Sequence, residues 1–177
     1  MLTKIKRAFG LTLFMMSLAV SLPAQQGGNA QSGQRQPSAP ARPFVVLSSQ
    51  SQQDIERKLR PENKVEELIG GAGMQLRVAV QHDKTRPSAD AEVHDASDDI
   101  YYVLEGEATL TLGGRLDGPR EVEPGEWRSP RITGGQTFVI KKGDLIVVPR
   151  GTPHQRTGRD FTMILIKIFA EPVRAKQ

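Results

Sequence analysis

The sequence predicts an all-β fold, because short apolar stretches with strand periodicity follow one another and turn residues, not helical patterns, separate them. Residues 74–81 alternate apolar and polar side chains, as in a strand with one buried face. Further strands are expected at residues 100–104, 108–112, 136–140, 145–148 and 161–169. Clusters of glycine, proline and aspartate lie between them, which favours a sandwich or barrel over a parallel α/β sheet.

The length and composition of the chain are consistent with one such domain. A chain of 177 residues has room for a barrel of about 110 to 130 residues, which can bury most of its apolar strand faces without a disulfide. The sequence contains no cysteine. Disulfides, thiolate metal ligands, a cysteine nucleophile and a lipid-modified N-terminal cysteine are therefore excluded.

The first 24 residues have the pattern of a secretory signal peptide. Lys4, Lys6 and Arg7 precede an apolar run over residues 8–20, and small residues with a proline follow at 21–24. The run is shorter than the ~20 residues that a membrane span requires, which favours cleavage near Ala24 over a retained anchor. We therefore expect a secreted or periplasmic protein without membrane association after cleavage.

The positive charge of the chain is largely a property of this leader. The chain has 24 basic and 20 acidic residues, a formal net charge of +4. Removal of residues 1–24, which hold three basic and no acidic residues, lowers the net charge to +1. The remainder has no basic stripe with interleaved aromatic residues, which argues against nucleic acid as a partner.

Two segments link the leader to the predicted barrel. Residues 25–43 contain no large apolar side chain, so we expect a disordered tether rich in glutamine, glycine, serine and proline. Residues 44–73 are expected to pack on the barrel as a short strand at 44–47, a helix of one or two turns from Ser51 to Pro61, and a helical or extended piece at 65–69. The barrel then covers residues 74–170 and leaves a tail at 171–177.

One connection within the barrel is long. Residues 113–135 contain six glycines and three prolines, and loops of this length in a compact domain are usually lids, binding loops or excursions. We expect this segment to cover a pocket, with Trp127 as its apolar anchor. Its four arginines could hold an anionic substrate, although an ordinary solvated loop is equally compatible with them.

Residues 143–154, GDLIVVPRGTPH, combine a buried strand with two turns and end on a histidine. Gly143 permits a tight first turn, and Pro149 ends the strand pairing because it lacks an N–H group. Gly151 can adopt a positive φ, which allows the chain to double back. His154 is therefore expected to point into the barrel.

Residues 92–106, EVHDASDDIYYVLEG, place a second histidine among carboxylates. Glu92 and His94 are two positions apart on a strand, so their side chains share one face. Asp99 and Tyr101 share a face of the next strand by the same rule. Imidazole and carboxylate groups that converge on one face are suited to a divalent metal ion.

The segment at residues 143–154 closely resembles a motif of the cupin family. Gly143, Pro149, Gly151 and His154 match that motif at every spacing, and Gly158 stands where asparagine is usual. The resemblance covers about residues 74–169. It implies a double-stranded β-helix, or jelly-roll barrel, here preceded by one or two short N-terminal helices.

The segment at residues 92–106 resembles the other cupin motif with two departures. Gly106 fixes the register, so that His94 takes the second histidine position, Glu92 the first, and Asp99 the position of the usual glutamate. The resemblance implies a metal site of His94, Asp99, His154 and Glu92 that holds Fe, Mn, Ni or Zn. The shorter Asp99 leaves open whether it or Glu92 supplies the carboxylate ligand.

Two further residues and a partner follow from the same comparison. Glu92 is either a ligand or a general base, and Tyr101 either lines the pocket as a catalytic group or fills the barrel. His82 is more typical of a core or rim position than of a ligand. Because cupin barrels often pair through their sheets, the resemblance also implies a possible homodimer.

Two classes of function are compatible with these residues. The first is a divalent-metal-dependent enzyme that acts on a small polar or anionic molecule by dioxygenase-, isomerase- or lyase-type chemistry. The second is a non-catalytic cupin with a degenerate metal site, which binds a sugar or another small molecule. The fold does not decide between them.

The leader gives a direct prediction about the mature protein. We expect mass spectrometry of the protein purified from its native host to show a chain that begins near residue 25, because signal peptidase cleaves after a small residue such as Ala24. An intact first residue in a cytosolic fraction would contradict the prediction.

Overall fold

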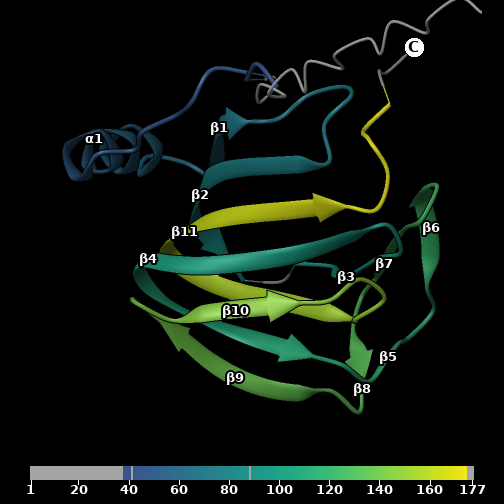
Figure 1. Cartoon of the computed structure of the whole chain (residues 1–177). Helices are drawn as coiled ribbons and strands as arrows, with labels where there is room; N and C mark the ends of the chain where they lie inside the picture. Colours follow the sequence, from purple (N-terminus) through teal and green to yellow (C-terminus); the bar gives the residue numbers. More distant parts are fainter. Residues whose placement is uncertain (1–37, 41, 88, 175–177) are drawn as a thin grey trace, which may run out of the picture. The chain divides into compact units, whose positions relative to one another are not determined.

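The computed structural model describes residues 38–40, 42–87 and 89–174, and the described residues from Arg42 onward belong to one compact unit (Figure 1). The predicted signal peptide and most of the predicted tether lie outside the described residues. Within the described part of the chain, no helix has the length and apolar character needed to cross a membrane.

The described chain consists mostly of strands, which confirms the predicted all-β class. One helix, α1 (Ser49–Leu59), precedes them. The strands are β1 (Lys64–Ile69), β2 (Leu76–Arg86), β3 (Ala91–His94), β4 (Ser97–Leu112), β5 (Arg115–Leu116), β6 (Arg120–Glu123), β7 (Glu126–Ser129), β8 (Ile132–Thr133), β9 (Gln136–Lys141), β10 (Leu145–Val148) and β11 (His154–Phe169).

The two longest strands, β4 and β11, form the frame of the barrel. Each has 16 residues, and they pair antiparallel along their whole length. β10 and β9 pair with the first and second halves of β4, whereas β2 pairs with the second half of β11 (Figure 1). The first residue of β11 also pairs with β3, so the sheet wraps around one interior.

β4 runs through Gly106, where the sequence predicted a break between two strands. The register between β4 and β11 shifts near Arg159 and Thr162, which is the mark of a β-bulge. Gly106 has a φ of 81°, and a Cβ atom at this position would lie 2.3 Å from the carbonyl oxygen of Asp160. Only glycine therefore allows the two strands to bend together here.

Apolar side chains fill both faces of this frame. The interior cluster comprises Tyr101, Val103, Ala108, Leu110, Ile140, Val148, Phe161, Met163 and Leu165. On the outer face, Leu59 of α1 packs with Val80 and Leu104. The helix begins at the N-cap Ser48, whose side chain accepts from the N–H of Ser51 at 3.1 Å. It is therefore one turn longer at its start than predicted.

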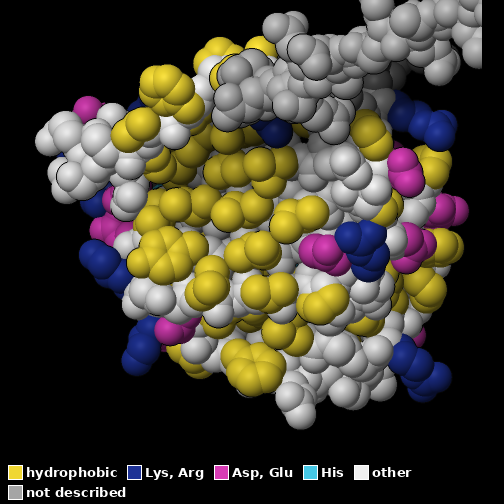
Figure 2. Space-filling view, viewed as in Figure 1, with side chains coloured by type: hydrophobic (Ala, Val, Ile, Leu, Met, Phe, Trp, Pro, Cys, Tyr) yellow, Lys and Arg dark blue, Asp and Glu magenta, His cyan; other side chains and the backbone are white. Residues whose placement is uncertain are grey.

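Part of the outer face is apolar and exposed to solvent. Leu145, Tyr102 and Ile164 form one row across β10, β4 and β11, and Val147, Ile100 and Ile166 form the next. Leu145 and Val147 are 66% and 57% exposed. Figure 2 shows hydrophobic side chains gathered over these strands. A sheet face turned to water normally carries polar side chains, so this surface is unusual.

Two local predictions differ from the structure, and a third, the helical or extended piece at 65–69, is extended. Residues 44–47 form no strand, and Phe44 is 90% exposed. Residues 65–69 lie in a strand, β1, which pairs with β2. Residues 113–135 are not a loop, because they contain β5 to β8, and β7 pairs with β3 along its length.

Candidate metal centre

A single backbone pairing brings the two motif segments together. β3 and β11 are antiparallel, with Glu92 directly opposite His154. The turn before β11 is tied to the same strand, because the Gly151 N–H donates to the carbonyl oxygen of His94 at 2.8 Å. The two imidazole rings consequently lie with their centroids 5.1 Å apart. Both side chains are buried, as the turn residues predict for His154.

Hydrogen bonds orient both imidazole rings toward one space. His94 Nδ1 lies 2.6 Å from Glu126 Oε2, and His154 Nδ1 lies 3.0 Å from the carbonyl oxygen of Thr152. Because these oxygens accept, the Nδ1 atoms carry protons and the Nε2 atoms face the shared space. The neutral ring of His154 offers its Nε2 lone pair, whereas His94 offers its own only after it loses a second proton. Both Nε2 atoms are buried without a hydrogen-bond partner among the described residues. Buried polar atoms rarely lack a partner. His82 Nε2 also lacks one, but only the Nε2 atoms of His94 and His154 lie together with carboxylate oxygens, which points to a shared ligand.

Two carboxylates complete the surroundings of this space. Glu92 Oε2 lies 3.6 Å from His94 Nε2 and 3.8 Å from His154 Nε2. Asp99 Oδ2 lies 3.5 Å and 4.0 Å from the same two atoms. A tetrahedral ion with bonds of about 2.0 to 2.1 Å separates its ligand atoms by about 3.4 Å. The distances from Glu92 Oε2 to the two Nε2 atoms therefore exceed those around a bound ion by a few tenths of an ångström, and the residues fit a divalent ion once the site contracts.

Glu92 is better placed than Asp99 to act as the carboxylate ligand. Ligand atoms of Glu92, His94 and His154 all lie within 4.8 Å of one another. Asp99 already has partners, since its Oδ1 accepts from Lys167 Nζ at 2.7 Å and its Oδ2 from the Tyr101 hydroxyl at 3.1 Å. The geometry therefore favours Glu92 in the ligand set, with Asp99 holding its neighbours in place.

The electrostatics of the centre prepare it for a cation. Burial works against ionisation of Asp99, but His94 and Lys167 hold the pKa of this carboxyl at about 2. Burial lowers the pKa of His154, which favours the neutral ring that a metal requires. Burial also works to lower the pKa of His94, but Asp99 and Glu126 raise it to about 9. An ion that binds here must displace the proton of His94.

Tyr101 lies in the wall of the centre as a neutral hydroxyl. Burial, together with the negative charge of Asp99, raises the pKa of Tyr101 well above 10. The group therefore acts as a hydrogen-bond donor and not as a base. The guanidinium group of Arg156 lies 5.4 Å from the centre of its ring, which adds a cation–π contact.

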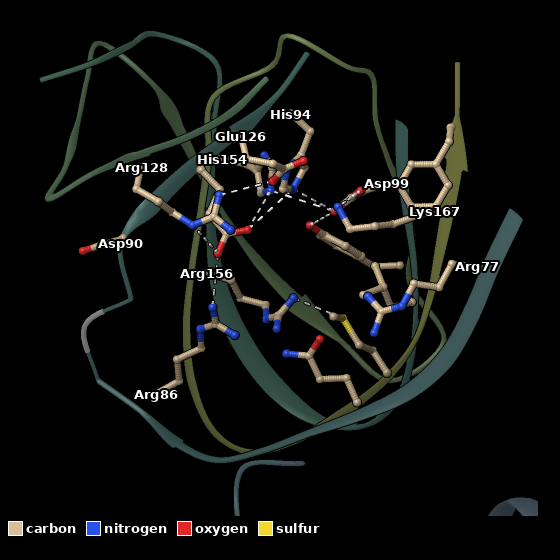
Figure 3. A pocket seen from close by; sticks show the side chains of 16 residues that line it. Arg77, Arg86, Asp90, His94, Asp99, Glu126, Arg128, His154, Arg156 and Lys167 are labelled. Carbon is tan, nitrogen blue, oxygen red and sulfur yellow. Dashed lines mark hydrogen bonds and ion pairs between the residues drawn. The ribbon is translucent and has the colours of Figure 1, made fainter. Parts of the chain in front are cut away.

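The centre opens into a polar cavity of about 250 Å³ (Figure 3). Besides the centre itself, its walls carry Arg77, Arg86, Arg128, Arg156 and Lys167 with Asp90 and Glu126. Figure 3 shows Arg86 and Arg128 on one side of the cavity and Lys167 with Asp99 on the other. Such a lining suits a small charged or polar molecule rather than an apolar one.

Sequence reasoning missed Glu126 and Lys167 of this wall, and it considered Arg128 only as one of four arginines that could hold an anionic substrate. Glu126 and Arg128 come from β7, inside the segment predicted to be a covering loop, and only the pairing of β7 with β3 brings them to the centre. Trp127 alternates to the other face of β7, where its indole N–H donates to Asp95 at 2.8 Å. Lys167 did carry a signal, because a lysine follows Met163 and Leu165 on the inward positions of an apolar strand.

A buried ion pair lies behind the cavity. Arg156 donates to Asp83 Oδ2 through Nη2 at 2.8 Å and through Nε at 3.2 Å. Arg156 is 8% exposed and Asp83 is 4% exposed. His82, the third histidine, points to the opposite side of β2, where its Nδ1 is 2.8 Å from Thr162 Oγ1. It lies in the core of the sheet rather than at the metal centre.

Comparison with known proteins finds similarity among solved structures. No family model matches the chain, and no curated protein matches it. The chain is similar to the BH2720 protein of Bacillus halodurans, with 22% identity, a TM-score of 0.48, and coverage of 76% of this chain and 86% of that chain. It is also similar to KdgF from Halomonas sp., with 17% identity, a TM-score of 0.45, and coverage of 64% of this chain and 82% of that chain. A cupin superfamily protein from Desulfitobacterium hafniense has 17% identity and a TM-score of 0.41, and the match covers 62% of this chain and 81% of that chain.

The fold class follows from the topology of the strands. The long β4 and β11 strands bend together, and the strands paired with them enclose one interior. This arrangement is the cupin-type double-stranded β-helix that the two motifs predict. The candidate metal centre occupies the interior that this fold encloses.

The Asp83–Arg156 pair gives a prediction about stability. In Asp83→Asn, Arg156 stays buried without a counter-charge, a change that typically costs about 3 to 5 kcal/mol. We expect a loss of this size in the free energy of unfolding, measured by urea denaturation at neutral pH. Asp160→Asn is the matched control, because Asp160 forms an exposed pair with Lys84, and exposed pairs contribute little to stability.

The same pair sets the pH dependence of that difference. Although burial opposes it, Arg156 and Gln81 hold the pKa of Asp83 below its usual range. Its stabilisation is therefore present above the unfolded-state pKa of about 3.9 and is lost as the pH falls through the lower folded-state pKa. The gap between parent and Asp83→Asn should narrow in acid. Equal stabilities at neutral pH would contradict this account.

Proposed function

We propose that the exported chain is a divalent-metal-dependent enzyme that acts on a small anionic molecule. The observation that carries the proposal is the pair of buried Nε2 atoms of His94 and His154, which have no partner within the described part of the chain and lie near Glu92. Two imidazoles and one carboxylate form the ligand set of many catalytic Zn and non-haem Fe sites. The centre opens to a cavity that a substrate can occupy.

The residues around the centre have distinct tasks in this proposal. A bound ion would supply Lewis-acid polarisation of substrate oxygens, or a site for dioxygen. Glu126 and the Thr152 carbonyl orient the two imidazoles, and Lys167 keeps Asp99 ionised and in place. The Tyr101 hydroxyl, held neutral, donates its one hydrogen bond to Asp99 and so helps to fix that carboxylate. Dioxygenase, isomerase and lyase reactions all use such a combination.

A non-catalytic binding protein is the second candidate. The observation that favours it is the replacement of one motif histidine by Glu92 and of the motif glutamate by Asp99. Metal analysis of the purified protein separates the two candidates. Stoichiometric Fe, Mn or Ni supports the enzyme, whereas a metal-free protein that a sugar or other solute stabilises supports the binding protein.

The ligand set gives a prediction about metal affinity. We expect Glu92→Gln and His154→Ala to weaken Zn²⁺ or Mn²⁺ binding, measured by titration calorimetry, by clearly more than 100-fold. Asp99→Asn should cost about 10- to 100-fold, as is typical of residues that only orient ligands. Glu123→Gln, an exposed position on β6, is the matched control and should bind as the parent does. Parent-like binding by the Glu92 and His154 variants would refute the centre.

We further propose that two copies of the chain pair through the exposed apolar face. The two rows of apolar side chains that begin at Leu145 and Val147 both cross β10, β4 and β11 of one sheet. The face of such a sheet can stack on the same face of a second copy. Burial of Leu145, Val147 and Tyr102, which are 66%, 57% and 43% exposed, supplies the driving force. A second copy offers the same apolar area in return.

Light scattering after size-exclusion chromatography tests the pairing. The parent protein should have the mass of a dimer, and Val147→Lys should have the mass of a monomer, because it places charges in the centre of the contact. Val122→Lys is the matched control, since Val122 is also exposed (43%) but lies on β6. A monomeric parent, or a dimeric Val147→Lys variant, would contradict the proposal.

A further inference from the structure

We infer that Arg86 and Arg128 form a carboxylate clamp beside the metal centre. The ligand of this clamp is a small carboxylic acid with an oxygen on the neighbouring carbon, a 2-hydroxy or 2-oxo acid. The inference rests on the proposed metal site and names the substrate class of that site. It depends on three observations: unused donors on these two arginines, the position of Glu92, and the charge balance of the cavity.

Arg86 and Arg128 differ from the other arginines of the cavity in how few donors they use. Arg156 makes two hydrogen bonds to Asp83, and Arg77 makes three to Glu67. Among the described residues, the side chain of Arg128 donates a hydrogen bond only to the carbonyl oxygen of Trp127, its neighbour in the chain. Within the same described part, the side chain of Arg86 makes only long ion pairs, to Asp83 and Glu92.

The carboxylates near these two arginines do not satisfy them. Arg86 lies 3.5 Å from both Asp83 and Glu92, and Arg128 lies 3.8 Å from Glu92 and 3.6 Å from Glu126. These are ion pairs at long range, whereas a well-formed bidentate contact has N–O distances near 2.8 Å. Each guanidinium has five N–H donors, so both groups have several donors left for a ligand.

The position of Glu92 shows how close the clamp is to the metal centre. Its Oε1 lies toward Arg86 and Arg128, while its Oε2 lies toward His94 and His154. One carboxylate therefore spans the distance between the arginines and the imidazoles. A ligand carboxylate held by the clamp has its own second oxygen, or an oxygen on the next carbon, within reach of the ion.

The charges of the cavity require an anion once a metal is bound. The six cationic side chains in the cavity and its ion pairs are Arg77, Arg86, Arg120, Arg128, Arg156 and Lys167, and the six carboxylates are Glu67, Asp83, Asp90, Glu92, Asp99 and Glu126. With both histidines neutral, as ligation requires, a divalent ion leaves two positive charges uncompensated. A carboxylate bound to the ion and the clamp reduces this excess.

The size of the cavity limits the acid to a small one. At about 250 Å³ it is below the range of about 300 to 1,000 Å³ that is typical of pockets for drug-sized ligands. Arg86 and Arg128 are 29% and 25% exposed, so their guanidinium groups are accessible to an acid that enters the cavity. The two arginines therefore favour ligands with a negative charge, and the ion favours ligands with a second oxygen that can bind it.

Titration calorimetry on the full chain loaded with Zn²⁺ or Mn²⁺ tests the clamp, with glycolate and glyoxylate as probes. Glycolamide is the neutral comparison, because it keeps the hydroxyl and lacks the carboxylate charge. We expect glycolate to bind at least tenfold more tightly than glycolamide. Arg86→Gln and Arg128→Gln should each weaken glycolate binding about tenfold or more, since hydrogen bonds to charged groups contribute about 1.5 to 3 kcal/mol.

Two controls separate the clamp from a general loss of charge. Arg60→Gln should bind glycolate as the parent does, because the Arg60 side chain is 54% exposed in a pair with Glu105 and does not line the cavity. Arg128→Lys keeps the charge but lacks the planar fork, so it should recover only part of the affinity. Circular dichroism spectra like that of the parent are required of every variant.

The outcomes distinguish the clamp from the metal site. A parent chain that binds no metal would overturn both proposals. Tight metal binding with equal affinity for glycolate and glycolamide would overturn the clamp alone. Parent-like glycolate binding by both glutamine variants would do the same. Weaker glycolate binding by these variants, with metal affinity unchanged, establishes the clamp.

Discussion

The antiparallel pairing of Glu92 with His154 is the constraint on which the candidate centre depends. β3 has only four residues, and its contact with β11 is fixed at this one position. The Gly151 N–H bond to the His94 carbonyl then secures the turn on the same strand. Because alternate residues of a strand face opposite sides, a shift of one residue would remove the histidines from the interior.

Charge pairing is the second organising feature of the barrel. The interior end that holds the centre contains buried Asp83, Asp99 and Arg156, and such groups are tolerated only when they have partners. Asp83 pairs with Arg156, and Asp99 pairs with Lys167. The two histidine Nε2 atoms in the same region have no partner among the described residues. The fold therefore satisfies its structural charges and leaves available the atoms that a cation requires.

The sequence predicted the frame of the fold well, because the information was local. The alternation at residues 74–81, the strand at 145–148 and the turn residues around Gly151 all correspond to the structure. The break predicted at Gly106 was wrong, since a bulge shared with β11 continues the strand there. The predicted loop at 113–135 was wrong because its short strands have no strong periodicity of their own. They are stabilised by pairing, of β7 with β3, of β6 with β7 and of β5 with β8.

The candidate site was predictable only in part, for the same physical reason. His94, His154, Glu92 and Asp99 stand at motif spacings, so the chain itself marks them. Glu126 and Arg128 reach the centre through the register of β7 on β3, and Arg86 through the end of β2. The pairing of strands that are distant in the sequence cannot be recognised from the identities of the residues that it brings together. Lys167 is the exception, because a charge among inward apolar positions marks a buried partner.

The most direct test of the metal centre is anomalous diffraction from crystals of the full chain grown with Zn²⁺ or Mn²⁺. Data collected on both sides of the absorption edge of the metal locate the ion without reference to activity. The account predicts one strong peak between His94 Nε2 and His154 Nε2, with a Glu92 oxygen at bonding distance. A peak only at surface carboxylates, or none in the barrel at saturating metal, would contradict it.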